Sequence, residues 1–258
     1  IGTDYNNLAL AWVEFGIDRK ITKRPVMVVP YAATYFSCVE YTREAVKEKL
    51  DKGVPMPWAG DENEFIQYGA KKIWKAIEQT VVAASDAMRW ISKCAAAYSR
   101  NPDNHRLKWG TPSGMVVWHR KPMLKPWRMN TVLDGSRIQM KAMSEQIGLD
   151  PNKMSTSTPP SFVHSMDAAH MCLAIDAAVY AGLRDFGVVH DSFSTHASDM
   201  EVFSQCIRDT FHEMYTSQDV LDGLRQQIQS GLDTELPELP PKGELDIDQV
   251  RKSTFFFS

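Results

Sequence analysis

Residues suited to chemistry occur in two places, and the first is the basic stretch "RKITKRPVMVVPYA", which begins at Arg19. Arg19, Lys23 and Tyr31 are separated by multiples of four residues, which would place them along one slowly drifting helix face. Two cations one turn apart suit a polyphosphate, and an aromatic ring beyond them suits a sugar or a base. Pro25 and Pro30 argue against an unbroken helix, because each removes a backbone donor. A basic, solvated helix start is the alternative interpretation.

The second place is "GVVHDSF", where His190 and Asp191 follow a β-branched apolar run. An unpaired carboxylate is costly to bury, so it normally lies at the surface or binds a cation. Phe193 and Thr195 resume a strand-like pattern, which predicts a β-hairpin. The turn either presents the carboxylate to a metal ion or simply uses Asp-Ser, a common turn pair. His164 in "FVHS" is expected just ahead of a helix, where a lone histidine is more often a packing residue.

The chain of 258 residues has the composition of an ordinary globular protein, with 43% hydrophobic and 24% charged residues. Its net charge of −3 argues against a protein coated in nucleic acid, but the charges are unevenly distributed. Residues 87–142 contain eleven Lys and Arg against two Asp, whereas residues 199–251 contain twelve Asp and Glu against four Lys and Arg. We interpret the basic middle as a candidate phosphate-binding face; two solvated faces are the alternative.

The cysteines show neither a CxxC pair nor a metal-ligand spacing with histidine, and they are Cys38, Cys94, Cys172 and Cys206. We expect them to be reduced, packed thiols of a cytoplasmic protein. No apolar run approaches the roughly 20 residues of a membrane span, so no membrane contact is expected. Because the chain begins at Ile1 and not at methionine, we expect a fragment, a processed product or a partly ordered chain.

Hydrophobic periodicity predicts helices at residues 7–16, 37–53, 65–98 and 200–215, and a further helix that starts near Ser165 with Asp167 in its first turn. Residues 106–140 have an extended pattern, in which Asp134-Gly135 is a strong hairpin signal. The segment "DPNKMSTSTPP" is expected to be a loop. Helices dominate over strands, so the predicted fold class is α+β, mainly helical.

Taken in order, these stretches resemble the single-subunit, phage-type DNA-dependent RNA polymerases. The matching stretches are "RKITKRPVMVVPYA", "AKKIWKAIEQTVVAASDAMRW", "SFVHSMDAAHM", "VVHDSFSTHASD" and "LPPKGELDIDQVRKSTFFFS", which together cover essentially the whole chain. The resemblance implies the fingers and part of the palm of a right-hand polymerase, with a β-hairpin that carries a metal-binding aspartate. It implies fingers helices at 1–105, an extended hairpin at 106–142, and a palm hairpin with C-terminal helices at 143–258.

The resemblance also implies roles around the nucleotide. Arg19 and Lys23 match the fingers-helix residues that hold the incoming triphosphate. Tyr31 matches the tyrosine that helps to distinguish ribose from deoxyribose, and His164 matches the histidine near the 2′-hydroxyl. Phe36 falls where the family has an aromatic residue that stacks near the downstream template base.

Asp191 matches the palm aspartate that binds catalytic Mg²⁺, and His190 matches its neighbour in the same turn. The family's first metal-binding aspartate lies upstream of its fingers helix, and neither Asp4 nor Asp18 sits in that motif. Nucleotidyl transfer holds two metal ions between carboxylates on both sides, so one ligand is missing from this chain. We therefore expect a second polypeptide that carries the first aspartate, and an inactive chain in its absence.

The promoter-reading hairpin of the family corresponds to the extended segment, where Arg128, Asn130, Arg137 and Gln139 lie. Arg, Asn and Gln suit bidentate contacts with base edges in the major groove. The expected partners are therefore the DNA template and promoter, the nascent RNA and ribonucleoside triphosphates, in the cytoplasm of a host cell if the source is a bacteriophage.

The implied function is DNA-templated synthesis of RNA by two-metal nucleotidyl transfer, and two alternatives stay open. One is a DNA polymerase of the related palm-and-fingers family, in which an acidic residue usually follows the aspartate where Ser192 stands here. The other is a non-catalytic subunit that only binds nucleic acid. The chain also departs from the RNA polymerase pattern at Ala32, where the family usually has glycine.

Overall fold

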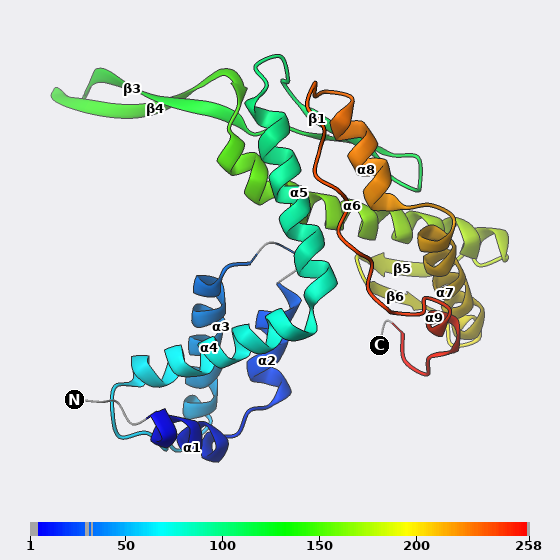
Figure 1. Cartoon of the computed structure of the whole chain (residues 1–258), viewed down its shortest axis with the longest axis horizontal. Coiled ribbons are helices and arrows are strands. Elements are labelled where there is room, and N and C mark those ends of the chain that lie inside the picture. Colours follow the sequence, from blue (N-terminus) through cyan, green and yellow to red (C-terminus); the bar gives the residue numbers. More distant parts are fainter. Residues whose placement is uncertain (1–4, 29–30, 32, 257–258) are drawn as a thin grey trace. The chain divides into compact units, whose positions relative to one another are not determined.

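The computed structural model describes residues 5–28, 31 and 33–256, and the chain consists of two compact units, residues 1–89 and 90–258. The described strands pair into three separate two-stranded antiparallel sheets, and the other described elements are helices (Figure 1). The mainly helical α+β class is therefore confirmed. In the described part of the chain, no helix combines the length and apolar character that crossing a membrane requires.

The first unit is helical, with α1 Tyr5–Phe15, α2 Arg19–Met27, α3 Tyr35–Asp51 and α4 Glu62–Thr80. Its core centres on Trp12 of α1, whose ring stacks on Phe65 of α4 with centroids 4.4 Å apart. The Trp12 Nε1–H also donates to the Phe65 carbonyl at 2.8 Å. Gly69 lets α4 approach this ring, because a Cβ there would lie 2.1 Å from Trp12.

Helix α2 has a well-defined start. The Asp18 carboxylate accepts hydrogen bonds from the backbone N–H of Lys20 at 2.9 Å and of Ile21 at 3.1 Å, which caps the helix. Lys49 of α3 lies 3.3 Å from the same carboxylate and donates to the Gly16 carbonyl at 2.7 Å. Desolvation alone would raise the pKa of Asp18, but these hydrogen bonds and the Lys49 charge lower it. The contacts fix the first turn of α2 against α3.

The predicted long helix at 65–98 is instead two helices, because α4 ends at Thr80 and α5 spans Val82–Arg100. Val81 between them has a non-helical backbone (φ −106°, ψ 50°). Three β-branched residues in a row, Thr80 to Val82, weaken the helix here, although the apolar spacing continues past the break. The boundary between the two units falls within α5.

The second unit contains the strands β1 Leu107–Gly110, β2 Val116–His119, β3 Pro122–Leu133, β4 Ser136–Leu149, β5 Phe186–Val189 and β6 Ser192–Thr195. Its further helices are α6 Pro151–Tyr180, α7 Met200–Thr216, α8 Val220–Gln229 and α9 Gln249–Lys252. Helix α6 packs along α7, and the α7 bounds agree with the predicted helix at 200–215. Figure 1 shows β3 and β4 as a long two-stranded ribbon joined at the predicted Asp134-Gly135 turn.

The expected loop "DPNKMSTSTPP" is wrong, because these residues form the start of α6. Asp150 caps the helix through the backbone N–H of Asn152 and Lys153, and Pro151 occupies the first turn, where no backbone donor is needed. Met154 and Phe162 are buried with helical spacing, so packing keeps Pro159 and Pro160 within the helix. His164 and Asp167 therefore lie within α6 and not at its start.

Candidate functional site

The hairpin β5–β6 holds Asp191 at its tip. Val189 pairs with Ser192, so His190 and Asp191 form a two-residue turn, and the turn pair is not Asp-Ser. His190 adopts the left-handed conformation (φ +54°) that such tight turns require. The carboxylate of Asp191 is exposed, and no hydrogen bond or ion pair engages it within residues that the structure describes.

The opposite side of the hairpin is apolar and fixes the turn. Phe186, Val188 and Phe193 point to one face and pack against a buried cluster that includes Phe203 and Ile207 of α7. Alternating exposure along both strands leaves the other face in solvent. Asp191 is thus an exposed acidic group at the tip of a well-anchored hairpin.

Asp167 of α6 lies beside this turn, which sequence reasoning missed. Its Oδ2 atom is 3.6 Å from His190 Nδ1. Burial, together with the nearby Asp167 charge, raises the pKa of Tyr215 to about 12. The sequence predicts only a helix start for Asp167, and no residue spacing signals a contact between α6 and a turn more than twenty positions later.

Two histidines on α6 have different surroundings. His164 is exposed one turn before Asp167, so the two side chains are neighbours on the helix surface. His170 is 3% exposed, and its Nε2 atom lies 2.9 Å from the Ile207 carbonyl. Burial lowers the pKa of His170, which disfavours its charged form. His170 is therefore a core residue that joins α6 to α7, whereas the side chain of His164 is exposed.

In the first unit, Arg19 and Lys23 are exposed one turn apart on α2, as the spacing predicts. Tyr31 does not continue that face, because the helix ends at Met27. Its backbone N–H donates instead to the Val28 carbonyl at 3.0 Å, in a turn after the helix. Pro30 and Ala32 lie outside the described residues.

Phe36 is also in the first unit, in the first turn of α3, and is 73% exposed. A large aromatic ring that solvent reaches to this extent contributes little to the core, which leaves it available for stacking. The structure therefore gathers the basic and aromatic candidates in the first unit, and Asp191, His190 and His164 in the second.

The β3–β4 hairpin places its four candidate residues on one face. Arg128 is opposite Lys141, Asn130 is opposite Gln139, and Val132 is opposite Arg137, and these pairs alternate with pairs on the other face. Gln139 Nε2 donates to Asn130 Oδ1 at 3.1 Å. The result is a polar, cationic face along a ribbon of mostly exposed residues.

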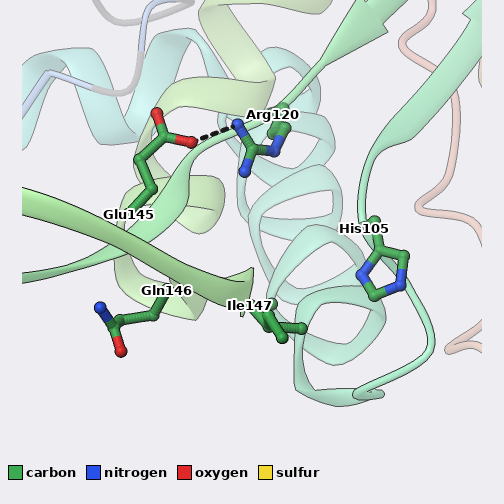
Figure 2. Close-up of a pocket in the computed structure, with 6 residues that line it drawn as sticks. His105, Arg120, Glu145, Gln146 and Ile147 are labelled. Atoms are coloured by element: carbon green, nitrogen blue, oxygen red, sulfur yellow. Dashed lines mark hydrogen bonds and ion pairs between the residues drawn. The ribbon is translucent and has the colours of Figure 1, made fainter.

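A pocket of about 500 Å³ lies at the base of this ribbon, and Figure 2 shows its lining residues. Arg120 donates to Glu145 Oε2 at 2.8 Å, and in Figure 2 His105 lies on the side away from Glu145. The backbone N–H of Asp150 donates to the Lys121 carbonyl at 2.8 Å just beyond. These contacts fix the base of the ribbon to the unit.

Among the described residues of the two units, no group of three or more His, Cys, Asp or Glu side chains lies together in a way that could hold a metal ion.

Cys38 and Cys94 are buried and form no disulfide, but Cys172 is exposed on α6, so the expectation that all four thiols are packed is wrong for that residue.

Comparison with known proteins places the chain in a family. The sequence model of the DNA-dependent RNA polymerase family matches residues 3–236. The chain therefore belongs to this family, and the phage-type resemblance is confirmed. It is 31% identical to the DNA-directed RNA polymerase of Enterobacteria phage T3 over 98% of its length, and 29% identical to the T7 RNA polymerase of Escherichia phage T7 over 97%.

A plant relative is similar to the same extent. The DNA-directed RNA polymerase 2, chloroplastic/mitochondrial, of Arabidopsis thaliana is 33% identical over 94% of this chain. The chain spans 30% of the length of the two phage relatives and 23% of the plant relative. Membership of the DNA-dependent RNA polymerase family favours the RNA polymerase alternative over the DNA polymerase alternative.

Proposed function

We propose that this chain is the C-terminal fingers and palm portion, or subunit, of a DNA-directed RNA polymerase that extends RNA by two-metal nucleotidyl transfer. The observation that carries the proposal is the exposed Asp191 carboxylate at the tip of an anchored two-residue turn. Its oxygens face no described donor, which suits a Mg²⁺ ligand. A single carboxylate holds only part of a two-ion site, so a second aspartate comes from outside this chain.

In the proposed reaction, the 3′-hydroxyl oxygen of the RNA forms a bond to the α-phosphorus of the nucleotide. The bond from that phosphorus to the bridging oxygen breaks, pyrophosphate leaves with its electron pair, and the hydroxyl proton passes to solvent. Bound Mg²⁺ would offset charge on the phosphate oxygens and favour the deprotonated hydroxyl. Asp191 would position the reacting groups from the palm side.

The other residues would bind and select the substrate. Arg19 and Lys23 are exposed cations one turn apart, which suits contacts with a polyphosphate. Tyr31 and His164 would contact the sugar of a ribonucleotide, and Phe36 would stack near the template base. The reaction would take place on DNA in the cytoplasm, which is that of a host cell if the source is a bacteriophage.

The β3–β4 ribbon would contact promoter DNA. Its polar face presents guanidinium and amide groups at two-residue spacing, which is the chemistry of direct base readout. The residues on this face are Arg128, Asn130, Arg137 and Gln139.

Mixing experiments test the proposal and distinguish it from a subunit that only binds nucleic acid. The purified chain is given a primed DNA template, ribonucleotides and Mg²⁺, with and without the polypeptide that carries the upstream aspartate motif. We expect RNA synthesis only in the mixture. Synthesis by the chain alone contradicts the missing-ligand argument, and a mixture that stays inactive while binding DNA supports the non-catalytic alternative.

A further inference from the structure

The two faces of the β1–β2 sheet have opposite surroundings. On the inner face, Trp109 is fully buried and its Nε1–H donates to Ser165 Oγ of α6 at 2.8 Å. His119 lies on the same face, with its Nε2 atom 2.9 Å from Ser157 Oγ. These two contacts fix the sheet to α6, so its outer face is held rigidly toward solvent.

The outer face carries an exposed tryptophan flanked by cations. Trp118 is 54% exposed and pairs directly with Lys108 across the sheet. The Arg106 guanidinium carbon lies 4.2 Å from the centre of the indole, and Lys108 Nζ lies 5.7 Å from it. Both distances are within the range of cation–π attraction, so the two charges are held at the ring.

The charge around this face suits a polyanion. Residues 104–133 contain six Lys and Arg and no Asp or Glu. Arg120 is paired with Glu145, but no described carboxylate pairs with Arg106 or Lys108. Their positive charge is therefore not neutralised within the part of the chain that the structure describes. Aromatic rings interleaved with such cations are how proteins bind single strands without reading their sequence.

We propose that Trp118, Arg106 and Lys108 form a stacking platform for a single-stranded polynucleotide. This platform is separate from the four candidate residues of the β3–β4 ribbon and from Asp191. One base stacks on the part of the indole that Arg106 leaves exposed, and the phosphates on either side of it contact the two cations. The inference rests on the proposed function for the supply of a single strand, which transcription provides as unpaired DNA or as nascent RNA. Binding at this platform requires no chemistry at Asp191.

The test measures binding without catalysis. The complete enzyme that contains this chain is titrated into short fluorescein-labelled single strands of RNA and of DNA, in EDTA, and anisotropy is recorded. We expect Trp118→Ala to weaken binding by about 5-fold to 150-fold and Trp118→Phe to retain most of it, because the ring is kept. Val116→Ala, an exposed apolar change on the same face, is the matched control and should leave binding unchanged.

Two further measurements test the role of the cations and the preference for single strands over duplex DNA. Arg106→Gln with Lys108→Gln should flatten the salt dependence by about 0.7 per lost phosphate contact, whereas Lys252→Gln should not. Weaker binding of Trp118→Ala to single-stranded RNA, to single-stranded DNA or to both supports the platform. The kind of strand whose binding is weakened is the kind that the platform binds. Unchanged binding by Trp118→Ala, or an equal loss with duplex DNA, overturns it. Asp191→Asn should bind as the unmodified enzyme does, so failure of the platform is distinguishable from failure of the proposed reaction.

Discussion

Asp167 of α6 lies 3.6 Å from His190 in the β5–β6 turn, from Oδ2 to Nδ1. The pair joins a long, packed helix to the turn that carries Asp191, and the turn residue it holds has the left-handed backbone of a tight turn. Asp167 is therefore placed to orient His190 and, through the backbone, the neighbouring carboxylate.

We expect Asp167→Asn to lower kcat for nucleotide addition by about 2-fold to 5-fold in the complete enzyme, with little change in KM. The effect is small because His190 is largely exposed, and exposed pairs contribute only about 0–1 kcal/mol. Steady-state kinetics measure it, and Asp176→Asn, an exposed aspartate on the same helix, is the control. Equal loss in both variants would rule out a specific role for Asp167.

Tyr31→Phe should relax the choice of sugar with little loss of rate. The ring stays, but a hydroxyl hydrogen bond worth about 0.5–1.5 kcal/mol is lost, so the preference for ribonucleotides should fall by about 2-fold to 13-fold. Tyr35→Phe is the matched control, because its hydroxyl bonds the Gln67 carbonyl within the same unit. The rates with ribo- and deoxynucleotides give the answer, and an unchanged ratio in Tyr31→Phe removes this residue from sugar selection.

Two glycine substitutions should change stability in opposite directions. Gly69→Ala places a methyl group against the Trp12 ring, so the free energy of unfolding should fall by about 1–3 kcal/mol. Gly223→Ala in α8 meets no atom within 4 Å and should raise it by about 0.5–1 kcal/mol. Urea denaturation checks both. A neutral Gly69→Ala would contradict the packing of α1 on α4.

Thiol labelling should separate the cysteines. Burial raises the pKa of Cys94 to about 12, so almost none of it is thiolate at pH 8, and Cys38 is raised in the same direction. Cys172 is exposed and should react first with an aromatic disulfide reagent. The rates in native buffer and in denaturant check this, and Cys172→Ser should remove the fast phase. Rapid native labelling of Cys94 would contradict its burial.

Structural features that are determined by neighbouring residues could be predicted from the sequence, whereas features that depend on tertiary packing could not. The Asp134-Gly135 hairpin follows from turn chemistry, and the β5–β6 hairpin follows from strand alternation, although its turn pair is His190-Asp191 and not Asp-Ser. The start of α6 was not, because buried Met154 and Phe162 outweigh a Pro- and Ser-rich composition that favours a loop.

The candidate site likewise contains residues that the sequence predicted and residues that only the tertiary structure shows. Asp191 came from a motif and lies in the expected turn, although its role stays a proposal. Asp167 was missed, because its contact with His190 depends on how α6 packs against the hairpin. The exposed cations beside Trp118 were counted as part of a basic region, but their positions around the ring required the strand register.

The most direct test of the central claim is Asp191→Asn in the complete enzyme, with Asp185→Asn, an exposed aspartate just before β5, as the control. Single-nucleotide extension of a primed template is measured alongside thermal unfolding. Because the carboxylate is exposed and no hydrogen bond or ion pair from the described residues engages it, we expect extension to be abolished while unfolding is unchanged, and Asp185→Asn to remain active. Near-normal extension by a folded Asp191→Asn enzyme would contradict the assignment of Asp191 as the metal-binding aspartate.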